Sequence, residues 1–305
     1  MIDIAIIGGG PAGLSAGLYA ARAGMKTVLL EQFVPGGQAA QILTLENYPG
    51  FPAGIDGPAL TMAIAEQAQH AGMEIEYRTV NSIRRADGGH FRLISDDGEL
   101  TARAVIIASG AIPRKLGVAR EKELTGRGVS YCATCDGAFF KGKRVAVVGG
   151  GDTALTDALV LANYAEKVYL IHRRDAWRGS PRLAERVQAQ PKIEPLLKRT
   201  VQQLLGDDKL SGLLLRDSAS GLETTIEVEG LFVAVGISPV SEFVAGLLEQ
   251  NASGQIITDR KLQSSVPGIF AAGDVRDTLL RQVITAAADG ALAATMAAEY
   301  LLDNQ

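Results

Sequence analysis

Near its start the sequence reads IDIAIIGGGPAG (residues 2–13), an apolar run that ends in closely spaced glycines. A short apolar run of this kind is typical of a buried parallel strand. Residues 14–23 have helical composition, and residues 25–30 are predicted as a second strand that leads to Glu31. Strand, G-x-G-x-x-G, helix, strand and acid together make the dinucleotide-binding fingerprint. The sequence therefore predicts a nucleotide site here, with the pyrophosphate at the helix start and a ribose at Glu31; a plain glycine turn is the alternative.

The same unit recurs later in the chain. A shift of 141 residues (8 to 149) places Gly8 on Gly149 and Gly10 on Gly151, and leucines of the first helix then fall on leucines of the second. An internal repeat of this kind indicates two copies of one supersecondary unit. We therefore predict two nucleotide-binding units; a helix that merely packs on a strand is the alternative for the second.

The two copies differ at the position that contacts the ribose. Glu31 falls on His172, which is followed by Arg173 and Arg174, with Arg178 nearby. An acid repels a 2′-phosphate on the ribose, whereas arginines bind it through bidentate hydrogen bonds. We therefore expect an ADP moiety without a 2′-phosphate at the first site and NADP at the second. A solvated basic corner is the alternative, and His172 has no catalytic role in this interpretation.

The two cysteines of the chain, Cys132 and Cys135, lie in the run SYCATCDG (residues 130–137). A C-x-x-C pair can carry two electrons as dithiol and disulfide, and this spacing tends to lower the pKa of one thiol. A structural zinc site usually needs four ligands, and three histidines are the other candidate nitrogen ligands in the sequence. A zinc site, a structural disulfide and a pair of inert thiols stay open as alternatives.

Composition narrows the class of protein. The chain has 305 residues, 47% of them hydrophobic, and a net charge of −4, as expected for a globular protein with room for about two domains. Neither a basic run that would indicate nucleic acid nor an apolar run of membrane-spanning length occurs in the sequence. The first strand begins at Ile2, which leaves no room for a signal peptide. We expect a cytoplasmic protein, in which cysteines are more often catalytic than structural.

Two similar segments bracket the second unit. Residues 104–113 and 230–239 each contain an apolar strand, a glycine and then a proline. This pairing predicts an inserted domain that the chain enters and leaves through a double linker. We expect an α/β fold of two Rossmann-like, three-layer domains, one formed by residues 1–113 and 240–305 and the other by residues 114–239. The other expected elements are a helix at 58–71, a strand pair at 74–80 and 91–95, strands within 193–227, and an alanine-rich, core-facing helix at 281–299.

Taken together, these motifs resemble the low-molecular-weight, bacterial-type thioredoxin reductases within the pyridine nucleotide-disulfide oxidoreductases. The resemblance covers nearly the whole chain. Its most specific feature is the C-A-T-C-D-G block just before the second glycine motif; in the related glutathione and lipoamide reductases the redox pair lies near the N-terminus, in the FAD domain. It also rests on both glycine motifs, the arginine signature, and Gly273-Asp274 followed by Arg281-Gln282.

The resemblance implies noncovalent FAD on the discontinuous domain and NADPH on the inserted domain. It implies that Cys135 faces the flavin, that Cys132 attacks the disulfide of thioredoxin, and that Asp136 moves their protons, a task that suits a general acid or base. The implied FAD contacts are Gly8, Gly10, Pro11, Ala12, Gly13, Glu31, Gln32, Gly36, Gly37, Gln38, Asn47, Val80, Gly110, Gly273, Asp274, Arg281, Gln282 and Val283. The implied NADPH contacts are Gly149, Gly151, Asp152, Thr153, Ala154, His172, Arg173, Arg174 and Arg178.

One flavin must meet the nicotinamide and the disulfide in turn. Because both belong to the inserted domain, we expect this domain to rotate about linkers near residues 111–115 and 236–241. The resemblance also implies a homodimer through the FAD domains. Alternatives are NADH or ferredoxin as electron donor, another thioredoxin-fold protein as acceptor, or a redox-sensing flavoprotein without turnover.

Three positions depart from the family pattern. Thr156-Asp157 stands where many relatives carry two glutamates, which leaves the contacts on the nicotinamide side open. Gly179 replaces the usual alanine after the last arginine and would loosen that loop. Residues 278–280 lie in a segment that varies within the family, so no flavin contact is assigned to them.

Overall fold

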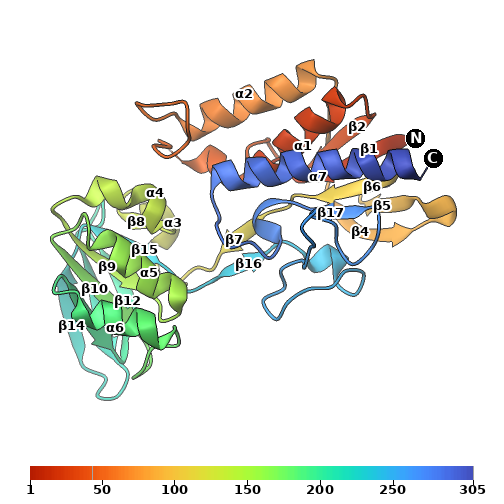
Figure 1. The fold of residues 1–305 in the computed structure, drawn as a ribbon. Helices are drawn as coiled ribbons and strands as arrows, with labels where there is room; N and C mark the ends of the chain where they lie inside the picture. The colour runs from red at the N-terminus through yellow and green to blue at the C-terminus, as the bar shows by residue number, and fades with distance from the viewer. Residues whose placement is uncertain (43, 305) are drawn as a thin grey trace. The chain divides into compact units, whose positions relative to one another are not determined.

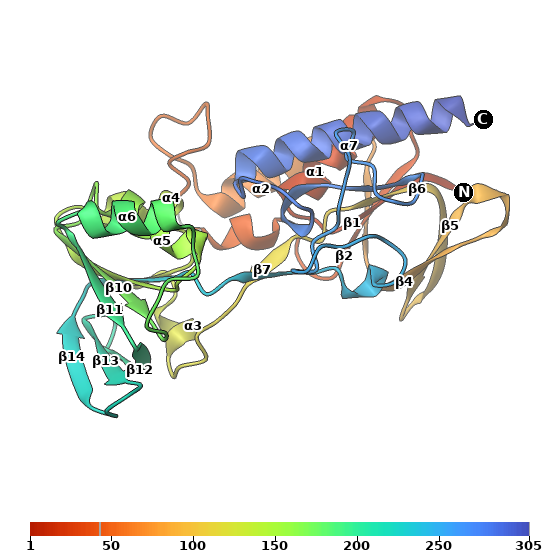
Figure 2. The same ribbon diagram turned by 60° about the horizontal axis from the view of Figure 1, so that its bottom comes forward.

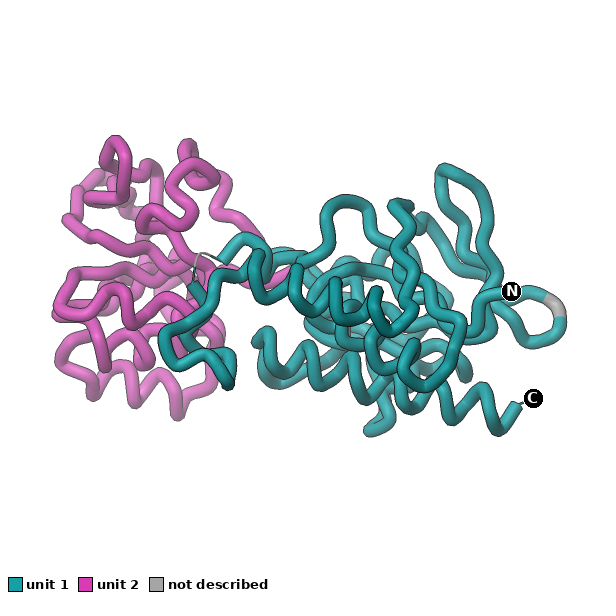
Figure 3. Tube along the Cα trace, turned by 90° about the horizontal axis from the view of Figure 1, so that it is seen from above, with its two compact units in different colours: residues 1–112, 238–305 teal, residues 113–237 magenta. Residues whose placement is uncertain are grey.

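The chain divides into two compact units, coloured separately in Figure 3. The computed structural model describes residues 1–42 and 44–304. Unit 1 comprises residues 1–112 and 238–305, and unit 2 comprises residues 113–237, so unit 2 is inserted into the sequence of unit 1. Among the described residues, every helix is too short or too polar to cross a membrane.

A seven-stranded sheet forms the centre of unit 1. Its order is β3-β2-β1-β6-β5-β4, and β17 pairs with β6. The long strand β6 joins the two halves of the sheet, since its first residues pair antiparallel with β5 and its last residues lie parallel to β1 and β17. The strands are β1 (Ile2–Ile7), β2 (Thr27–Glu31), β3 (Glu74–Tyr77), β4 (Val80–Arg85), β5 (Phe91–Ser95), β6 (Gly98–Ile107) and β17 (Ile269–Ala271).

Helices cover one face of this sheet, as Figures 1 and 2 show. They are α1 (Pro11–Arg22), α2 (Gly57–His70) and α7 (Val283–Asp303). Side chains of β1 alternate between two cores, as a period of two requires: Ile4 and Ile6 pack with the helices, whereas Ala5 and Ile7 pack with the β4–β5 hairpin and with Val244. Short helical turns lie at η1 (Gly37–Gln41), η2 (Asp87–Gly89), η4 (Glu242–Val244) and η5 (Gly273–Val275).

Unit 2 has three layers around a five-stranded parallel sheet of order β11-β10-β9-β15-β8. Helices α5 and α6 pack on one face, and the antiparallel sheet β12-β13-β14 packs on the other. The strands are β8 (Val129–Ser130), β9 (Arg144–Val148), β10 (Lys167–His172), β11 (Ile193–Leu197), β12 (Arg199–Leu205), β13 (Gly212–Asp217), β14 (Glu223–Glu227) and β15 (Gly230–Val233). The helices are α3 (Glu121–Leu124), α4 (Ala133–Asp136), η3 (Gly137–Phe140), α5 (Asp152–Leu161) and α6 (Pro181–Ala189).

The two linkers pair with each other. Strands β7 (Ala111–Pro113) and β16 (Ile237–Pro239) form a two-stranded sheet. Backbone hydrogen bonds of 2.9 Å flank it, from Arg114 to Gly236 and from Val240 to Gly110. Both crossings of the chain therefore run through one short ribbon.

The predicted fold class is confirmed, and one predicted strand pair is wrong. Residues 74–80 were expected to pair with residues 91–95, but β3 instead lies parallel to β2, with Val28 opposite Glu74. The antiparallel partner of β5 is β4, which follows β3 after two residues. The helix α2 returns the chain to the sheet edge in the parallel sense, as a β-α-β crossover does.

Candidate active site

The first glycine motif lies at the carboxyl end of β1. Gly8 has a φ of +104°, and a Cβ there would lie 2.5 Å from the carbonyl oxygen of Ala108, the residue after β6. A Cβ at Gly13 would lie 1.8 Å from the carbonyl oxygen of Gly8, so the helix packs directly on the turn, whereas a Cβ at Gly10 would meet nothing within 4 Å. These are the three roles that a dinucleotide motif gives its glycines: turn, close helix packing and open approach.

Glu31 organises the loop around this motif. Its Oε2 accepts a hydrogen bond of 2.6 Å from the N–H of Gly9, and its Oε1 accepts from the N–H groups of Gln32 and Phe33 at 2.7 and 3.1 Å. A carboxylate has about four lone-pair sites, so capacity remains for a ribose hydroxyl. Val80 begins β4, two residues after Arg78, whose N–H donates to the carbonyl of Glu31.

Several contacts join segments of unit 1 that are far apart in the sequence. The N–H of Gly36 donates to the carbonyl of Gly9 at 2.7 Å, and a Cβ at Gly37 would lie 3.0 Å from the Cα of Gly10. The Gln38 amide donates to the carbonyl of Ala111, next to Gly110. Asn47 Nδ2 donates to Gln282 Oε1 at 2.9 Å, although 235 residues separate them. The structure thus gathers predicted residues from the loop, the linker and the start of α7.

Asp274 and Arg281 lie close to each other at the end of β17. Asp274 is half-buried; burial raises the pKa of its carboxyl, the Arg281 guanidinium opposes this rise, and Asp289 adds to it. Arg281 Nε is buried without a hydrogen-bond partner among the described residues. Gly273 lies against α1, because a Cβ there would be 3.0 Å from that of Ala12. Val283 follows the Gln282 cap as the first residue of α7.

The second glycine motif repeats this geometry in unit 2. A Cβ at Gly149 would lie 2.3 Å from the carbonyl oxygen of Ala234, and a Cβ at Gly151 would meet nothing within 4 Å. In unit 1 the Glu31 carboxylate packs on Gly9, at 2.9 Å from a Cβ built there; in unit 2 the His172 ring packs on Gly150, at 2.2 Å. The residues that the shifted alignment superposes therefore hold equivalent places. Asp152, Thr153 and Ala154 form the first turn of α5.

His172 and the arginines have different surroundings. The His172 side chain is buried, stacks on Trp177 with ring centroids 5.6 Å apart, and leaves its Nε2 without a partner among the described residues. Burial lowers its pKa, and Arg178, Arg174 and Arg173 lower it further. The three arginines are exposed, and each is near enough to His172 to lower its pKa.

The loop that carries the arginines is anchored. The N–H groups of Arg178 and Gly179 both donate to the carbonyl of Gly150, at 2.6 and 3.0 Å, and the N–H of Ser180 donates to Asp152 Oδ1 at 2.6 Å. A Cβ at Gly179 would lie 2.6 Å from Leu155 Cδ1. The loosening expected from Gly179 is therefore not observed, because the glycine lets the loop pack on the start of α5.

Cys132 and Cys135 form a disulfide, with their Cα atoms 5.3 Å apart. The pair follows β8, so it lies at the carboxyl edge of the sheet that also carries the second glycine motif. Cys132 Sγ accepts the N–H of Cys135 at 3.2 Å and lies 3.4 Å from Thr134 Oγ1. In this state both thiolate ligands that a zinc site would need are engaged in the disulfide.

Asp136 ends the short helix α4 and is half-buried. Burial raises the pKa of its carboxyl, and a hydrogen bond from Ser130 opposes the rise. The Ser130 hydroxyl lies 2.6 Å from Asp136 Oδ2. Ser130 could not be assigned a role from the sequence, because nothing in a serine two residues before a cysteine indicates a contact with an acid.

Asp157 is a second acid that the sequence did not assign. Burial raises the pKa of its carboxyl to about 7. It lies on α5 one turn before Leu161, which contacts the position of a Cβ at Gly137, just after Asp136. Residues four apart share a helix face, so Asp157 lies on the side of α5 toward the redox motif.

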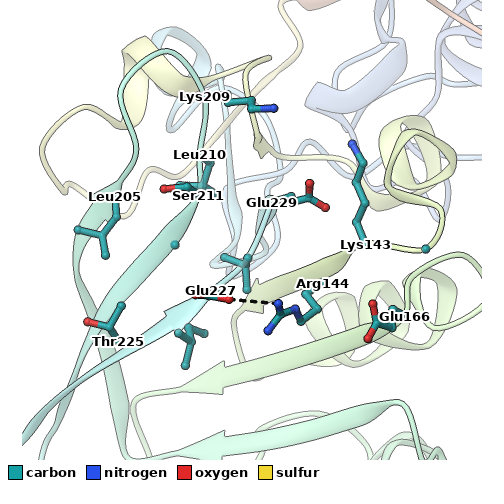
Figure 4. A pocket seen from close by; sticks show the side chains of 14 residues that line it. Lys143, Arg144, Glu166, Leu205, Lys209, Leu210, Ser211, Thr225, Glu227 and Glu229 are labelled. Carbon is teal, nitrogen blue, oxygen red and sulfur yellow. Dashed lines mark hydrogen bonds and ion pairs between the residues drawn. The ribbon is translucent and has the colours of Figure 1, made fainter.

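A hollow of about 660 Å³ lies elsewhere in unit 2, and Figure 4 shows the side chains that line it. Its lining includes Arg144 and Glu227, which form an ion pair of 3.1 Å. Arg144 begins β9, whereas Gly149 follows the other end of that strand. The hollow therefore lies away from the glycine motif and the disulfide.

The chain is similar to known proteins over nearly its whole length. Residues 2–290 match the family model described as pyridine nucleotide-disulphide oxidoreductase. A thioredoxin reductase of Listeria monocytogenes is 43% identical over 301 residues, which cover 98% of this chain and 93% of that protein. A thioredoxin reductase of Treponema pallidum is 44% identical over 302 residues, which cover 98% and 97%.

A solved structure shows the same fold. The crystal structure of thioredoxin reductase from Streptococcus pyogenes matches with a TM-score of 0.93 and 42% sequence identity, and the match covers 99% of each chain. Together with the two glycine motifs and the disulfide, these likenesses establish the family. The chain belongs to the pyridine nucleotide-disulphide oxidoreductases.

Proposed function

We propose that the chain is a thioredoxin-disulfide reductase, which passes two electrons from NADPH, through noncovalently bound FAD, to the Cys132–Cys135 disulfide and on to oxidised thioredoxin. The observation that carries this proposal is the disulfide at the carboxyl edge of the sheet that bears the second glycine motif. Relatives with 43% and 44% identity bear the name thioredoxin reductase, which supports the reaction and the acceptor.

The residues of unit 1 fit FAD. Helix α1 begins without a side-chain cap, so N–H groups of its first turn can bind a pyrophosphate. Glu31 keeps capacity for a ribose hydroxyl. Asp274 accepts no hydrogen bond from the described residues, and its half-buried carboxyl suits a ligand rich in hydroxyl groups. When bound, FAD supplies the capacity to take up two electrons and to hand them to a disulfide.

The residues of unit 2 fit NADPH. Gly151 is open to a close approach, and α5 begins without a side-chain cap. Arg173, Arg174 and Arg178 offer several donors for a 2′-phosphate, and arginine binds phosphate with two parallel hydrogen bonds. In this proposal His172 supports the site by packing its ring on Gly150. It carries no positive charge there, because burial and the arginines disfavour its protonation.

The two sulfurs of the redox motif have different roles in the proposed reaction. Two electrons and two protons convert the disulfide into a dithiol. The Cys132 thiolate, stabilised by the N–H of Cys135 and by Thr134, attacks one sulfur of the thioredoxin disulfide; the other thioredoxin sulfur leaves and takes a proton. The Cys135 thiolate then attacks Cys132 Sγ, which reforms the disulfide and releases the second thioredoxin thiol.

Asp136 exchanges protons with these sulfurs. Its raised pKa brings the carboxyl closer to the pH at which a thiolate must gain or lose a proton. The acid follows Cys135 directly, so it can serve both the leaving thioredoxin sulfur and the thiols of the motif. In this role Asp136 is the general acid and base of the reaction.

The linkers would let unit 2 turn. They pair as one ribbon, so a change of φ and ψ in a few linker residues can rotate unit 2 as a body. We expect that joining the two units with a bifunctional crosslinker abolishes turnover while FAD stays bound. Crosslinks within a single unit are the control. Full turnover by protein crosslinked between its units would contradict the rotation.

The proposal includes a cytoplasmic homodimer that associates through its FAD-binding units. Leu279 and Leu280, which precede α7, and Ile284 and Leu292 within it are exposed apolar residues in unit 1 that suit such an interface. Sedimentation velocity of the flavin-loaded protein tests this part, and a monomer at micromolar concentration would contradict it.

A steady-state assay of the purified flavoprotein tests the function. The assay follows oxidation of NADPH or NADH with oxidised thioredoxin present or absent. The proposal expects rapid oxidation of NADPH that depends on thioredoxin. A preference for NADH would overturn the donor, turnover only with another thioredoxin-fold protein would overturn the acceptor, and no turnover with any of them would favour a redox sensor.

A further inference from the structure

Ser130 occupies a buried and rigid position beside the redox motif. It ends β8, whose pairing with β15 places Phe232 opposite Ser130 and Leu231 opposite Val129. The residue is 6% exposed. A side chain on a paired strand is held more precisely than one on a loop. Ser130 therefore has a well-defined position next to the cysteines.

Three polar atoms surround the Ser130 hydroxyl oxygen. Asp136 Oδ2 lies at 2.6 Å, the Cys132 N–H donates to the hydroxyl at 3.1 Å, and the carbonyl oxygen of Cys132 lies at 3.4 Å. A hydroxyl has one proton to donate and two lone pairs. With Asp136 ionised, the proton goes to the carboxylate, and the distance is that of a charge-assisted O–H···O bond.

We propose that Ser130 is a positioning residue that holds Asp136 in one place in both of its protonation states. This inference rests on the proposed function, in which Asp136 exchanges protons. When Asp136 is neutral, its own proton points to Ser130 Oγ, and the Ser130 proton turns to the carbonyl of Cys132. The hydroxyl then accepts from Asp136 and from the Cys132 N–H and donates to the Cys132 carbonyl, whereas with Asp136 ionised it donates to Asp136 and accepts from the Cys132 N–H, so it is bonded to Asp136 in both states.

The buried surroundings of Asp136 make its hydrogen bond with Ser130 important. Burial raises the pKa of Asp136, and the Ser130 hydrogen bond lowers it. The other ionisable groups on or beside the elements packed around α4 are the thiols of the motif in its reduced form, Asp152 and Asp157 on α5, Lys141 after η3, and Tyr164, whose ring lies against Gly137. Loss of the hydroxyl therefore leaves burial unopposed and raises the pKa of Asp136.

The test compares pH profiles of thioredoxin reduction by flavin-loaded Ser130→Ala, Ser130→Thr and wild-type protein. Asp136→Asn identifies the limb of the profile that belongs to Asp136. In Ser130→Ala this limb is expected to move up by about one pH unit, the size of a lost hydrogen bond to a charged group. Ser130→Thr keeps a hydroxyl and should leave the limb in place. Ser218→Ala, at an exposed serine of unit 2, is the matched control.

The outcomes separate the two hypotheses. If Asp136→Asn keeps the limb, the role proposed for Asp136 is wrong. If Asp136→Asn loses the limb but Ser130→Ala only lowers the rate equally at every pH, or moves the limb down, the inference about Ser130 is wrong. Ser130→Gly removes the same hydroxyl and gives the same test should Ser130→Ala fail to bind FAD.

Discussion

Arg276 and Asp289 form a two-bonded ion pair in unit 1, with 2.7 Å from Nε to Oδ2 and 3.0 Å from Nη2 to Oδ1. Asp289 Oδ2 also accepts the N–H of Gly273 at 3.0 Å. The side chains are 17% and 15% exposed. The pair therefore ties α7 to the turn that carries Asp274, the acid assigned to FAD.

Replacement of Asp289 should loosen this turn. Asp289→Ala leaves a largely buried guanidinium and the Gly273 N–H without their acceptor, so the free energy of unfolding should fall by about 2–3 kcal/mol. FAD affinity should fall as well. Urea unfolding and a titration of flavin-free protein with FAD measure the two effects. Glu299→Ala removes an exposed acid from the same helix and serves as control; equal effects of the two variants would contradict the assignment.

Alanine substitutions at two glycines of the first motif should have different effects, one on stability and the other on FAD binding. Gly13→Ala places a Cβ 1.8 Å from the carbonyl oxygen of Gly8, so it should destabilise the fold with or without FAD. Gly10→Ala meets nothing in the protein and should fold normally but lose FAD, because its Cβ takes the space of the pyrophosphate. Thermal unfolding of the flavin-free variants and their bound FAD after purification distinguish these effects. If the Gly10→Ala protein binds as much FAD as the wild type, the pyrophosphate does not lie beside Gly10 and the assignment is wrong.

Asp157 should make stability depend on pH. Burial raises the pKa of its carboxyl to about 7 in the folded protein, from 3.8 for the free side chain. The folded state therefore disfavours ionisation, and stability falls as the pH rises from about 4 to about 7. Asp157→Asn should raise the free energy of unfolding by about 2 kcal/mol at pH 8 and by little at pH 4. Urea unfolding across this range is the measurement, with exposed Asp208→Asn as control; a gain that is equal at both pH values argues against a buried carboxyl.

The arginine loop should decide between the two nicotinamide cofactors. Arg174→Ala removes charge-assisted hydrogen bonds to the 2′-phosphate, so the KM for NADPH should rise about tenfold or more. The KM for NADH, which lacks this phosphate, should stay nearly unchanged. Arg216→Ala, at an exposed arginine of β13, is the control. Equal changes for both cofactors would mean that the arginine acts on the loop rather than on the phosphate.

The doubled glycine motif could be predicted from the sequence because each glycine answers a local steric demand. Gly8 and Gly149 each lie against the carbonyl of the residue that follows a neighbouring strand, so the motif predicts strand, turn and helix together. The shifted alignment places Glu31 on His172 and so predicts that the two side chains occupy equivalent positions. Their contacts confirm this, because Glu31 packs on Gly9 and His172 packs on Gly150.

Contacts between distant residues could not be predicted in this way. Arg276 and Asp289 resemble ordinary surface charges in the sequence, and Ser130 resembles any polar residue at the end of a strand. The predicted pairing of residues 74–80 with residues 91–95 is wrong because polar–apolar alternation does not reveal which neighbour a strand pairs with. The crossover through α2 places β3 beside β2, and the turn at 87–89 joins β4 to β5 as a hairpin.

The central claim is that electrons reach thioredoxin through Cys132 and Cys135. The most direct measurement is an anaerobic single turnover, in which flavin-loaded protein receives one equivalent of NADPH and then oxidised thioredoxin, and the thiols of thioredoxin are counted. We expect two thiols per NADPH for the wild-type protein. With Cys135→Ser we expect none, although NADPH still bleaches the flavin. Equal thiol yields from wild type and Cys135→Ser would contradict the account.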